Sequence, residues 1–356
     1  MIEEFYKRNP YELTSEKKES LLRKELAELT EFHKKNCKEY ERFLKAAGYK
    51  QENIKRVEDI PFYPVRMFKK YDLKSIDEKE VFKVMTSSGT TGQAVSKIYL
   101  NQETAMMQQK VMIKILNDFW GKKRLPMMIV DSPAVVKNRK LFSARGAAVI
   151  GLRMASSDMV YILNDDMSLN IEKLKDFLEK YQGQRFVIFG FTSIVWRHFY
   201  QELKKRNEKE NMPQAVLMTG GGWKKLEKES VTRDEFKKEI HEFCGINYFL
   251  DHYGMVEQTG CIYAECEYGH LHASIYSDVI VRDYKDYSPC VIGKPGILQV
   301  VSVLPRSYPG HSLLTEDEGV VLGEDDCPCG RKGKYIKVFG RMKDAELRGC
   351  SDTYAT

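Results

Sequence analysis

The stretch Thr86-Ser87-Ser88-Gly89-Thr90-Thr91-Gly92 places five hydroxyl residues and two glycines in seven consecutive positions, directly after an apolar run. Glycine lets a backbone approach an anion closely, and the hydroxyl and N–H groups of such a loop donate to phosphate oxygens. No Lys-Ser/Thr pair follows the second glycine, so the loop is not a Walker A motif. Taken alone, the stretch predicts either a phosphate-binding loop or an ordinary Ser/Thr-rich surface loop.

Short apolar runs and helical stretches alternate downstream of this loop. Three runs predict buried strands, at 127–130, 186–189 and 215–218. Four segments with helical patterns precede, separate or follow them, at 101–118, 171–182, 193–206 and 224–243. This alternation predicts an α/β domain with a mostly parallel core sheet.

The flanking regions have different patterns. Residues 15–48 carry Leu22, Leu26, Leu29 and Phe32 at helical spacing, which predicts one long amphipathic helix or two. Prolines then favour an extended connector over 60–68, and the runs after residue 278 are short and turn-rich. We therefore expect four regions: a helical N-terminal region of the same domain (1–80), an α/β core (81–278), a β-rich subdomain (279–340) and a hinge remnant with a mobile tail (341–356).

Charge and hydropathy exclude several classes of protein. The 356 residues include 57 basic and 51 acidic side chains, a net charge of +6, and both signs are interleaved along the chain. That pattern is typical of solvated helix faces, so we expect no nucleic-acid partner. The apolar runs are far shorter than the roughly 18 residues that span a bilayer, and no basic-then-apolar leader opens the chain. These features predict a cytoplasmic protein without a membrane span.

Further motifs follow the loop in a fixed order. Gly220-Gly221-Gly222 comes directly after a predicted strand, and Tyr253-Gly254 is followed by Glu257. Asp317 and Arg341 come later. Each has a plain structural interpretation, such as a turn or a helix cap. Together they resemble the signature series of the adenylate-forming superfamily of acyl-CoA synthetases, which implies an acyl-CoA synthetase-like α/β fold.

This resemblance implies a role for each motif. The loop Thr86–Gly92 would wrap the β- and γ-phosphates of ATP, and Gly220–Gly222 would let the adenine lie against the backbone. Tyr253, followed by Gly254, would stack on the adenine. Glu257 would bind Mg²⁺, whose charge helps to neutralise the phosphates. Asp317 would accept hydrogen bonds from the ribose hydroxyls, with Arg341 nearby.

The sequence resembles two branches of this superfamily. Thr219–Lys224, Glu227–Ser230 and the 60–69 connector are similar to the acyl-protein synthetases known as long-chain-fatty-acid–luciferin-component ligases, which feed an acyl reductase. Residues 327–331 and 340–344 are similar to phenylacetate-CoA ligases. The sequence ends at Thr356, and coenzyme A ligases continue into a further C-terminal domain, so its end favours the acyl-protein synthetases and a large N-terminal domain lacking that usual C-terminal domain. In coenzyme A ligases that domain carries a lysine that assists adenylation; here Lys97 is a candidate substitute for it, or an ordinary surface lysine at a strand edge.

The acyl-protein synthetases carry their acyl group on a cysteine near the C-terminus, and Cys350 occupies the matching place. A thiolate attacks an acyl-adenylate readily, and the thioester keeps the acyl group activated. We predict ATP-dependent activation of a carboxylic acid, expected to be a long-chain fatty acid, transfer to Cys350, and delivery to an acyl-CoA-reductase-like partner. The alternatives are transfer to coenzyme A or a carrier protein, with Cys350 a bystander, and a non-catalytic nucleotide-binding subunit of a reductase complex.

The cysteines are clustered towards the C-terminal half, where seven of the eight lie. In a chain without an export signal such clustering indicates a metal site before disulfides. Cys266 and His272 form one pair and Cys327 and Cys329 another, as a closed tetrahedral zinc site requires. His270 or Cys261 is an alternative ligand, and reduced buried cysteines are the alternative to a zinc site.

Overall fold

The computed structural model describes residues 2–87, 94–137, 144–221, 223 and 230–342. The chain forms two compact units, one from residues 1–118 and 253–351 and the other built mainly from 119–252. The unit boundaries differ from those expected from the sequence. Residues 253–278, which we expected in the α/β core, lie in the first unit and pair in its large sheet.

The N-terminal part of the first unit is helical, with α1 (Ile2–Lys7), α2 (Ser15–Asn36) and α3 (Lys38–Ala46). The predicted helical segment is thus two helices, because Cys37 between them is extended. Leu22, Leu26 and Leu29 are buried as predicted, whereas Phe32 is 43% exposed. The buried face of α2 therefore includes His33 in place of Phe32.

The connector after α3 is less extended than predicted. It contains short 3₁₀ turns around one two-residue strand, namely η1 (Gln51–Asn53), η2 (Val57–Asp59), β1 (Tyr63–Pro64), η3 (Val65–Lys69) and η4 (Glu78–Glu80). The prediction of extended chain is wrong for residues 65–68, because the segment winds into η3 after Pro64, which favours an extended conformation only in the residue before it.

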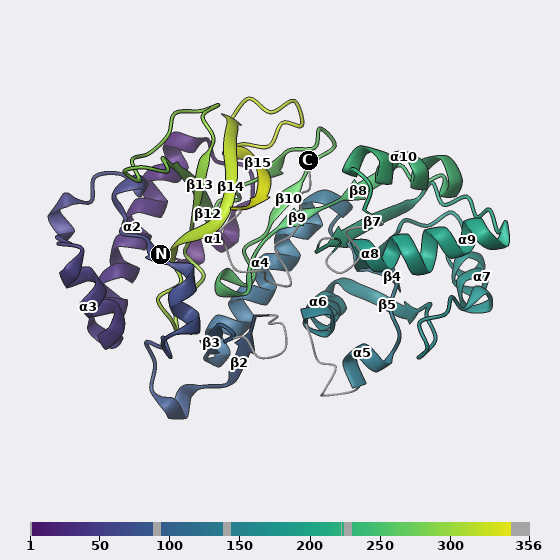
Figure 1. Ribbon diagram of the computed structural model, residues 1–356, viewed down its shortest axis with the longest axis horizontal. Helices are drawn as coiled ribbons and strands as arrows, with labels where there is room; N and C mark the ends of the chain where they lie inside the picture. The colour runs from purple at the N-terminus through teal and green to yellow at the C-terminus, as the bar shows by residue number, and fades with distance from the viewer. Residues whose placement is uncertain (1, 88–93, 138–143, 222, 224–229, 343–356) are drawn as a thin grey trace. The chain divides into compact units, whose positions relative to one another are not determined.

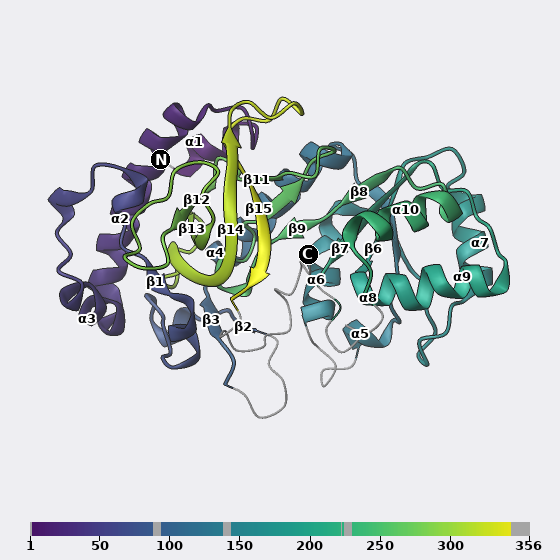
Figure 2. The ribbon, with the colours of Figure 1, turned by 45° about the horizontal axis from the view of Figure 1, so that its top comes forward.

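The large sheet of the first unit has the order β12-β13-β14-β15-β11-β10-β9 among the described residues, with β1 pairing in parallel along β14 (Figures 1 and 2). Its strands are β9 (His252–Tyr253), β10 (Tyr263–Glu265), β11 (Leu271–His272), β12 (Ser277–Arg282), β13 (Gly296–Ser302), β14 (Ser312–Glu324) and β15 (Lys334–Arg341). The predicted β runs after residue 278 are thus confirmed as neighbouring antiparallel strands.

Two further elements of the first unit bear on the site. A separate hairpin consists of β2 (Lys83–Thr86) and β3 (Lys97–Leu100), and it leads into α4 (Gln102–Trp120). The single-turn helix η9 (Val256–Gln258) lies between β9 and β10. The predicted phosphate loop therefore joins two antiparallel strands.

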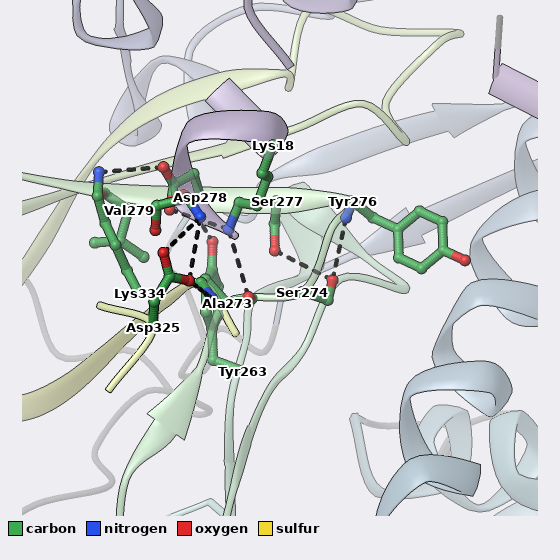
Figure 3. Close-up of polar contacts among 12 residues, drawn as sticks. Lys18, Tyr263, Ala273, Ser274, Tyr276, Ser277, Asp278, Val279, Asp325 and Lys334 are labelled. Atoms are coloured by element: carbon green, nitrogen blue, oxygen red, sulfur yellow. Dashed lines mark hydrogen bonds and ion pairs between the residues drawn. The ribbon is translucent and has the colours of Figure 1, made fainter. Parts of the chain in front are cut away.

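A buried ion network holds α2 to the large sheet (Figure 3). Lys18 Nζ lies 3.3 Å from Asp278 Oδ1, and Lys334 Nζ lies 3.1 Å from Asp278 Oδ2. Burial alone would raise the pKa of Asp278, but the two ammonium groups reverse this and hold that pKa below its usual range. One carboxylate thus joins α2, β12 and β15.

The second unit is built on a parallel sheet with the order β5-β4-β6-β7-β8. Its strands are β4 (Leu125–Ile129), β5 (Ser156–Tyr161), β6 (Phe186–Phe191), β7 (Ala215–Gly220) and β8 (Tyr248–Leu250). The three strands predicted from apolar runs are confirmed as β4, β6 and β7. The strand order reverses beside β4, and ligands of open α/β sheets bind outside the carboxyl ends of strands at such a point.

Helices connect these strands: α5 (Ala134–Lys137), α6 (Ala144–Leu152), η6 (Arg153–Ala155), α7 (Ile171–Lys180), α8 (Thr192–Ile194), η7 (Val195–Tyr200), α9 (Gln201–Arg206) and α10 (Arg233–Cys244). The helix predicted over 193–206 carries a π-helical segment at η7. Residues 224–229 of the helix predicted over 224–243 lie outside the described residues. The helix α10 begins at Arg233, where the Thr232 side chain accepts a hydrogen bond from Glu235 N and caps it. Among the described residues, no helix has the length and apolar character needed to cross a bilayer.

Candidate nucleotide site and candidate metal centre

The predicted phosphate loop begins at the end of the β2–β3 hairpin. At this end, the neck of the hairpin, the two strands are hydrogen-bonded to each other. Thr86, the last residue of β2, pairs with Lys97, the first of β3. Ser87 N donates to Ser96 O at 3.1 Å, and Ser96 N donates to Ser87 Oγ at 2.9 Å. Thr86 and Ser87 are therefore fixed at the base of the loop. Ser88, Gly89, Thr90, Thr91 and Gly92 lie outside the described residues.

Lys97 forms a surface ion pair at this neck. Its Nζ lies 3.3 Å from Asp72 Oδ1, and half of its side chain is exposed. The Tyr99 hydroxyl also donates to Asp72 Oδ1, at 2.7 Å. The Tyr99 hydrogen bond, and after it Lys97, lowers the pKa of Asp72. This geometry favours the interpretation of Lys97 as a surface lysine.

Three residues that the resemblance assigns to nucleotide binding meet in the first unit. Tyr253 OH donates to Asp317 Oδ2 at 2.6 Å, and Arg341 Nε lies 3.8 Å from Asp317 Oδ1. Asp317 and Arg341 face each other in the register of β14 and β15. Burial, and next the Asp317 charge, raises the pKa of Tyr253 well above its ordinary value, so the phenol stays protonated and acts as a donor.

Glu257, the predicted Mg²⁺ ligand, lies on the turn η9 and is buried. Gln258, which follows it, donates from Nε2 to Val300 O at 3.0 Å and to Gly310 O at 2.8 Å. Gly254 lies between Tyr253 and this turn, and a Cβ on Gly254 would lie 3.4 Å from Ile262 Cγ2. The first unit thus holds Tyr253, Glu257, Asp317 and Arg341 on elements of one sheet and its connecting turn.

The predicted adenine loop belongs to the second unit, at the end of β7. A Cβ on Gly220 would come within 2.8 Å of His252 Cε1, and one on Gly221 within 2.8 Å of Phe191 Cδ1. Gly221 also has a φ of 71°, which favours glycine. Thr192 Oγ1 donates to Gly221 O at 2.7 Å. Two aromatic rings therefore occupy the space that side chains at 220 and 221 would need, while Gly222 lies outside the described residues.

His252 is a residue of this site that sequence reasoning missed. Its ring lies against Gly220, and burial lowers its pKa, so the imidazole is neutral. In the sequence, the one indication of a role for His252 is its position directly before Tyr253. Its contact with Gly220 depends on the parallel pairing of β8 with β7.

The four predicted metal ligands converge in the first unit. Cys266, His272, Cys327 and Cys329 each present a ligand atom within 4.8 Å of the others. The Sγ atoms of Cys266 and Cys327 lie 3.9 Å apart, and Cys329 Sγ lies 3.3 Å from His272 Nε2. Zinc–sulfur bonds of about 2.3 Å in a tetrahedron separate two sulfurs by about 3.8 Å. The four side chains therefore fit a tetrahedral zinc ion.

The two alternative ligands lie differently. His270 Nδ1 is 3.2 Å from Cys327 Sγ, and its ring stacks on Tyr335 at 4.6 Å between centroids. This arrangement suits a partner that orients a thiolate ligand. Cys261 is buried, and burial raises the pKa of its thiol to about 11. Neither belongs to the converging set.

A charged residue borders the cluster. Arg331 follows Cys329 by two residues, and its Nε donates to Asp118 Oδ1 at 2.9 Å. Its guanidinium also lies over the Tyr11 ring, 5.7 Å from the centroid, and that ring meets His272 edge-on. The cluster therefore joins the N-terminal segment to β11 and to the loop before β15.

The chain is similar over most of its length to a known protein family and to two ligases of that kind. The family described as "Acyl-protein synthetase, LuxE" matches residues 2–356. The long-chain-fatty-acid–luciferin-component ligase of Vibrio harveyi is 22% identical over 335 residues, covering 90% of this chain and 84% of the relative. The ligase of the same description from Aliivibrio fischeri is 22% identical over 350 residues, covering 96% and 90%.

A solved structure with a similar fold is 2-hydroxyisobutyryl-CoA ligase in the postadenylation state with R3-HIB-AMP. Its TM-score is 0.71 at 16% identity, covering 95% of this chain and 70% of that one. At this identity the likeness shows the fold alone. The predicted adenylate-forming fold is therefore confirmed.

Proposed function

The chain belongs to the LuxE family of acyl-protein synthetases, and from this premise we propose that it activates a long-chain fatty acid with ATP and carries the acyl group on Cys350. The family match over residues 2–356 carries the proposal, because it includes both the phosphate loop and the cysteine near the end of the chain. The names of the relatives support a fatty acid as the substrate. Cys350 itself lies outside the described residues.

The first half-reaction forms an acyl-adenylate. A carboxylate oxygen of the acid attacks the α-phosphorus of ATP, and the bond from that phosphorus to the bridging oxygen breaks. Pyrophosphate leaves with the electron pair, and the acyl carbon now bears AMP as a good leaving group. Such phosphoryl chemistry is mostly positioning and charge stabilisation, so the protein must hold the phosphates and the ribose in place.

The residues that the family resemblance assigns to the nucleotide would perform this task. Thr86–Gly92 would donate to the β- and γ-phosphates, and Gly220–Gly222 would leave room for the adenine. Asp317, which accepts a hydrogen bond from Tyr253, would also accept hydrogen bonds from the ribose hydroxyls, with Arg341 beside it. Glu257 would hold Mg²⁺, which supplies positive charge to the departing pyrophosphate. Lys97 would reach the phosphates only by leaving Asp72.

In the second half-reaction the Cys350 thiolate attacks the acyl carbon, the bond to AMP breaks, and AMP leaves. The thioester retains the activation that a later reduction to an aldehyde requires. We propose an acyl reductase as the partner that receives the acyl group and the cytoplasm as the compartment.

We further propose a structural zinc ion held by Cys266, His272, Cys327 and Cys329. The support is the convergence of their four ligand atoms and distances that match a tetrahedron. Four protein ligands leave no open coordination position, so the ion would stabilise the fold without joining the reaction.

One experiment tests the function. The protein is incubated with ATP, Mg²⁺ and radiolabelled saturated fatty acids of increasing chain length, and hydroxylamine-labile label on the chain is measured. We expect label with a long-chain acid and none on Cys350→Ser, which should still exchange pyrophosphate into ATP. Label that persists on the serine variant contradicts the tail thioester. Acyl-CoA formed on adding coenzyme A would favour a coenzyme A ligase, and absence of exchange with every acid would favour a non-catalytic subunit.

A further inference from the structure

We propose that Gln258 is a positioning residue for the magnesium site, because its side-chain amide fixes the turn that presents Glu257. The inference rests on the proposed role of Glu257 as the Mg²⁺ ligand. Gln258 would act through Glu257 without touching the metal or the nucleotide.

The turn that carries Glu257 has little structure of its own. It is the three-residue 3₁₀ helix η9, in which Gln258 N donates to Met255 O at 3.1 Å. Single 3₁₀ turns have poorer hydrogen-bond geometry than α-helices and gain little from cooperativity. The position of the Glu257 carboxylate therefore depends on contacts from outside the turn.

Gln258 supplies two such contacts. Its Nε2 donates one hydrogen bond to Val300 O on β13, at 3.0 Å, and one to Gly310 O in the segment before β14, at 2.8 Å. Both amide protons are used, and both acceptors are backbone carbonyls, so the orientation of the amide is settled. The side chain ties η9 to two segments of the sheet that are separated from each other along the chain.

Gly310 holds the same turn from another direction. A Cβ at this position would lie 2.7 Å from Glu257 O and 2.3 Å from the Tyr308 ring. The backbone at Gly310 therefore packs directly against the backbone of Glu257. Together the Gln258 amide and the Gly310 contact leave the Glu257 main chain little freedom.

The acceptor end of the Gln258 amide is unused. Gln258 is 2% exposed, and its Oε1 is buried with no hydrogen-bond partner among the described residues. An orphaned buried acceptor costs free energy, and residues that break such a local rule are concentrated at functional sites. The two donated hydrogen bonds are what this side chain contributes.

Gln299 is a matched control in the same sheet. It is fully buried, and it uses both ends of its amide. Its Oε1 accepts from Arg282 Nε at 2.6 Å, and its Nε2 donates to Ser312 Oγ at 3.0 Å. It should therefore be at least as important for stability as Gln258, but the partners of its hydrogen bonds among the described residues are Arg282, Ile60 and Ser312, none of which lies on η9.

The test measures metal binding directly, with Mn²⁺ as a paramagnetic probe and a non-hydrolysable ATP analogue. Wild type, Gln258→Met and Gln299→Met are titrated, and free Mn²⁺ is followed by electron paramagnetic resonance. We expect Gln258→Met to weaken Mn²⁺ binding about ten- to a hundredfold, as when partners that orient metal ligands are lost. Gln299→Met should bind Mn²⁺ like wild type, even where its unfolding midpoint is lower.

Two results would overturn the proposal. One is wild-type Mn²⁺ affinity in Gln258→Met, and the other is equal weakening in Gln299→Met, which would indicate general loosening. Should Gln258→Met fail to fold, Gly310→Ala tests the same turn, because the added Cβ presses on Glu257 O. Failure of acid activation is seen separately, as absent pyrophosphate exchange in wild type that still binds Mn²⁺ and the analogue. Wild type that binds neither would defeat both proposals.

Discussion

The hydroxyl of Tyr253 donates a 2.6 Å hydrogen bond to Asp317 Oδ2, joining two residues that lie 64 positions apart. Both side chains are almost fully buried. Arg341 Nε lies 3.8 Å from the other carboxylate oxygen. The residues proposed for the adenine and the ribose are therefore directly hydrogen-bonded to each other. A substitution of Tyr253 should consequently weaken ribose binding by Asp317.

Tyr253→Phe should consequently affect both stability and nucleotide affinity. The loss of a hydrogen bond to a charged acceptor should lower the free energy of unfolding by about 1.5–3 kcal/mol. The KM for ATP should rise, because Asp317 loses the donor that holds it. Urea unfolding and pyrophosphate exchange at varied ATP measure the two effects.

Tyr263→Phe is the control for this prediction. Its ring packs near that of Tyr253, at 5.8 Å between centroids, but its hydroxyl donates to the Asp278 carbonyl. It should lower stability without raising the KM for ATP. A KM that rises equally in both variants would contradict a specific role for the Tyr253 hydroxyl.

The strands of the second unit could be predicted because buried parallel strands are continuous apolar runs. Residues 186–189 and 215–218 are such runs, and the strands β6 and β7 begin at the predicted residues. The start of α10 could not be placed, because the predicted segment is polar from residue 224 onward and the cap at Thr232 decides where the helix begins.

The sites show the same contrast. The ligand pairs of the metal cluster are close in sequence, so local spacing was enough to indicate them. The contact of His252 with Gly220 depends on how β8 lies beside β7, and the amide of Gln258 reaches two carbonyls that are 42 and 52 residues away. No pattern in a single sequence carries that information.

Cys327→Ser should remove the proposed zinc and destabilise the fold. The free energy of zinc binding to a structural site contributes directly to the free energy of folding. Loss of the zinc should therefore lower the free energy of unfolding by more than about 4–5 kcal/mol, the range of exceptional substitutions. Zinc content by plasma mass spectrometry should fall from one ion per chain to none. Wild type treated with a strong chelator should unfold at a similarly reduced urea concentration.

Cys290→Ser is the matched control for the metal centre. Its Sγ lies outside the cluster, 4.0 Å from Pro295 O, and the residue is partly exposed. We expect full zinc content and a wild-type unfolding midpoint. Wild-type protein that carries no zinc would refute the metal site, leaving reduced buried cysteines as the interpretation.

Asp278→Asn should be among the most damaging changes outside the two sites. It would leave Lys18 and Lys334 buried without a counter-charge, and breaking a buried pair from one side costs about 3–5 kcal/mol. Glu41→Gln removes one partner of the exposed Glu41–Lys45 pair and should leave the unfolding midpoint unchanged. Similar midpoints for the two variants would mean that water reaches the network.

Two histidines stack inside the first unit, His33 of α2 and His311 before β14, with ring centroids 5.0 Å apart. His33 Nε2 donates to the Pro305 carbonyl at 3.1 Å, so its Nδ1 accepts from Ser75 Oγ at 2.8 Å and the ring is neutral. His311 Nε2 lies 2.9 Å from Thr30 Oγ1. Both rings are held in the uncharged form by their surroundings.

This pair predicts loss of stability in acid. Burial, with further repulsion from Arg306, lowers the pKa of His33 to about 3, and burial together with His33 lowers the pKa of His311 well below its ordinary value. An unfolded histidine has a pKa near 6.5, so below that pH the unfolded chain binds protons that the folded chain does not. The stabilisation is complete above about pH 6.5 and falls by up to about 1.4 kcal/mol per pH unit for each histidine as the pH drops towards 3.

Urea unfolding of wild type, His33→Gln and Ser75→Ala over the range from neutral to mildly acidic pH measures this slope. His33→Gln should lose less stability per pH unit than wild type, because one titrating group is gone. Ser75→Ala removes the hydrogen bond to His33 but keeps both imidazoles, so its free energy of unfolding should be lower at every pH with the wild-type slope. A His33→Gln curve parallel to that of wild type would show that the pair does not govern the acid sensitivity.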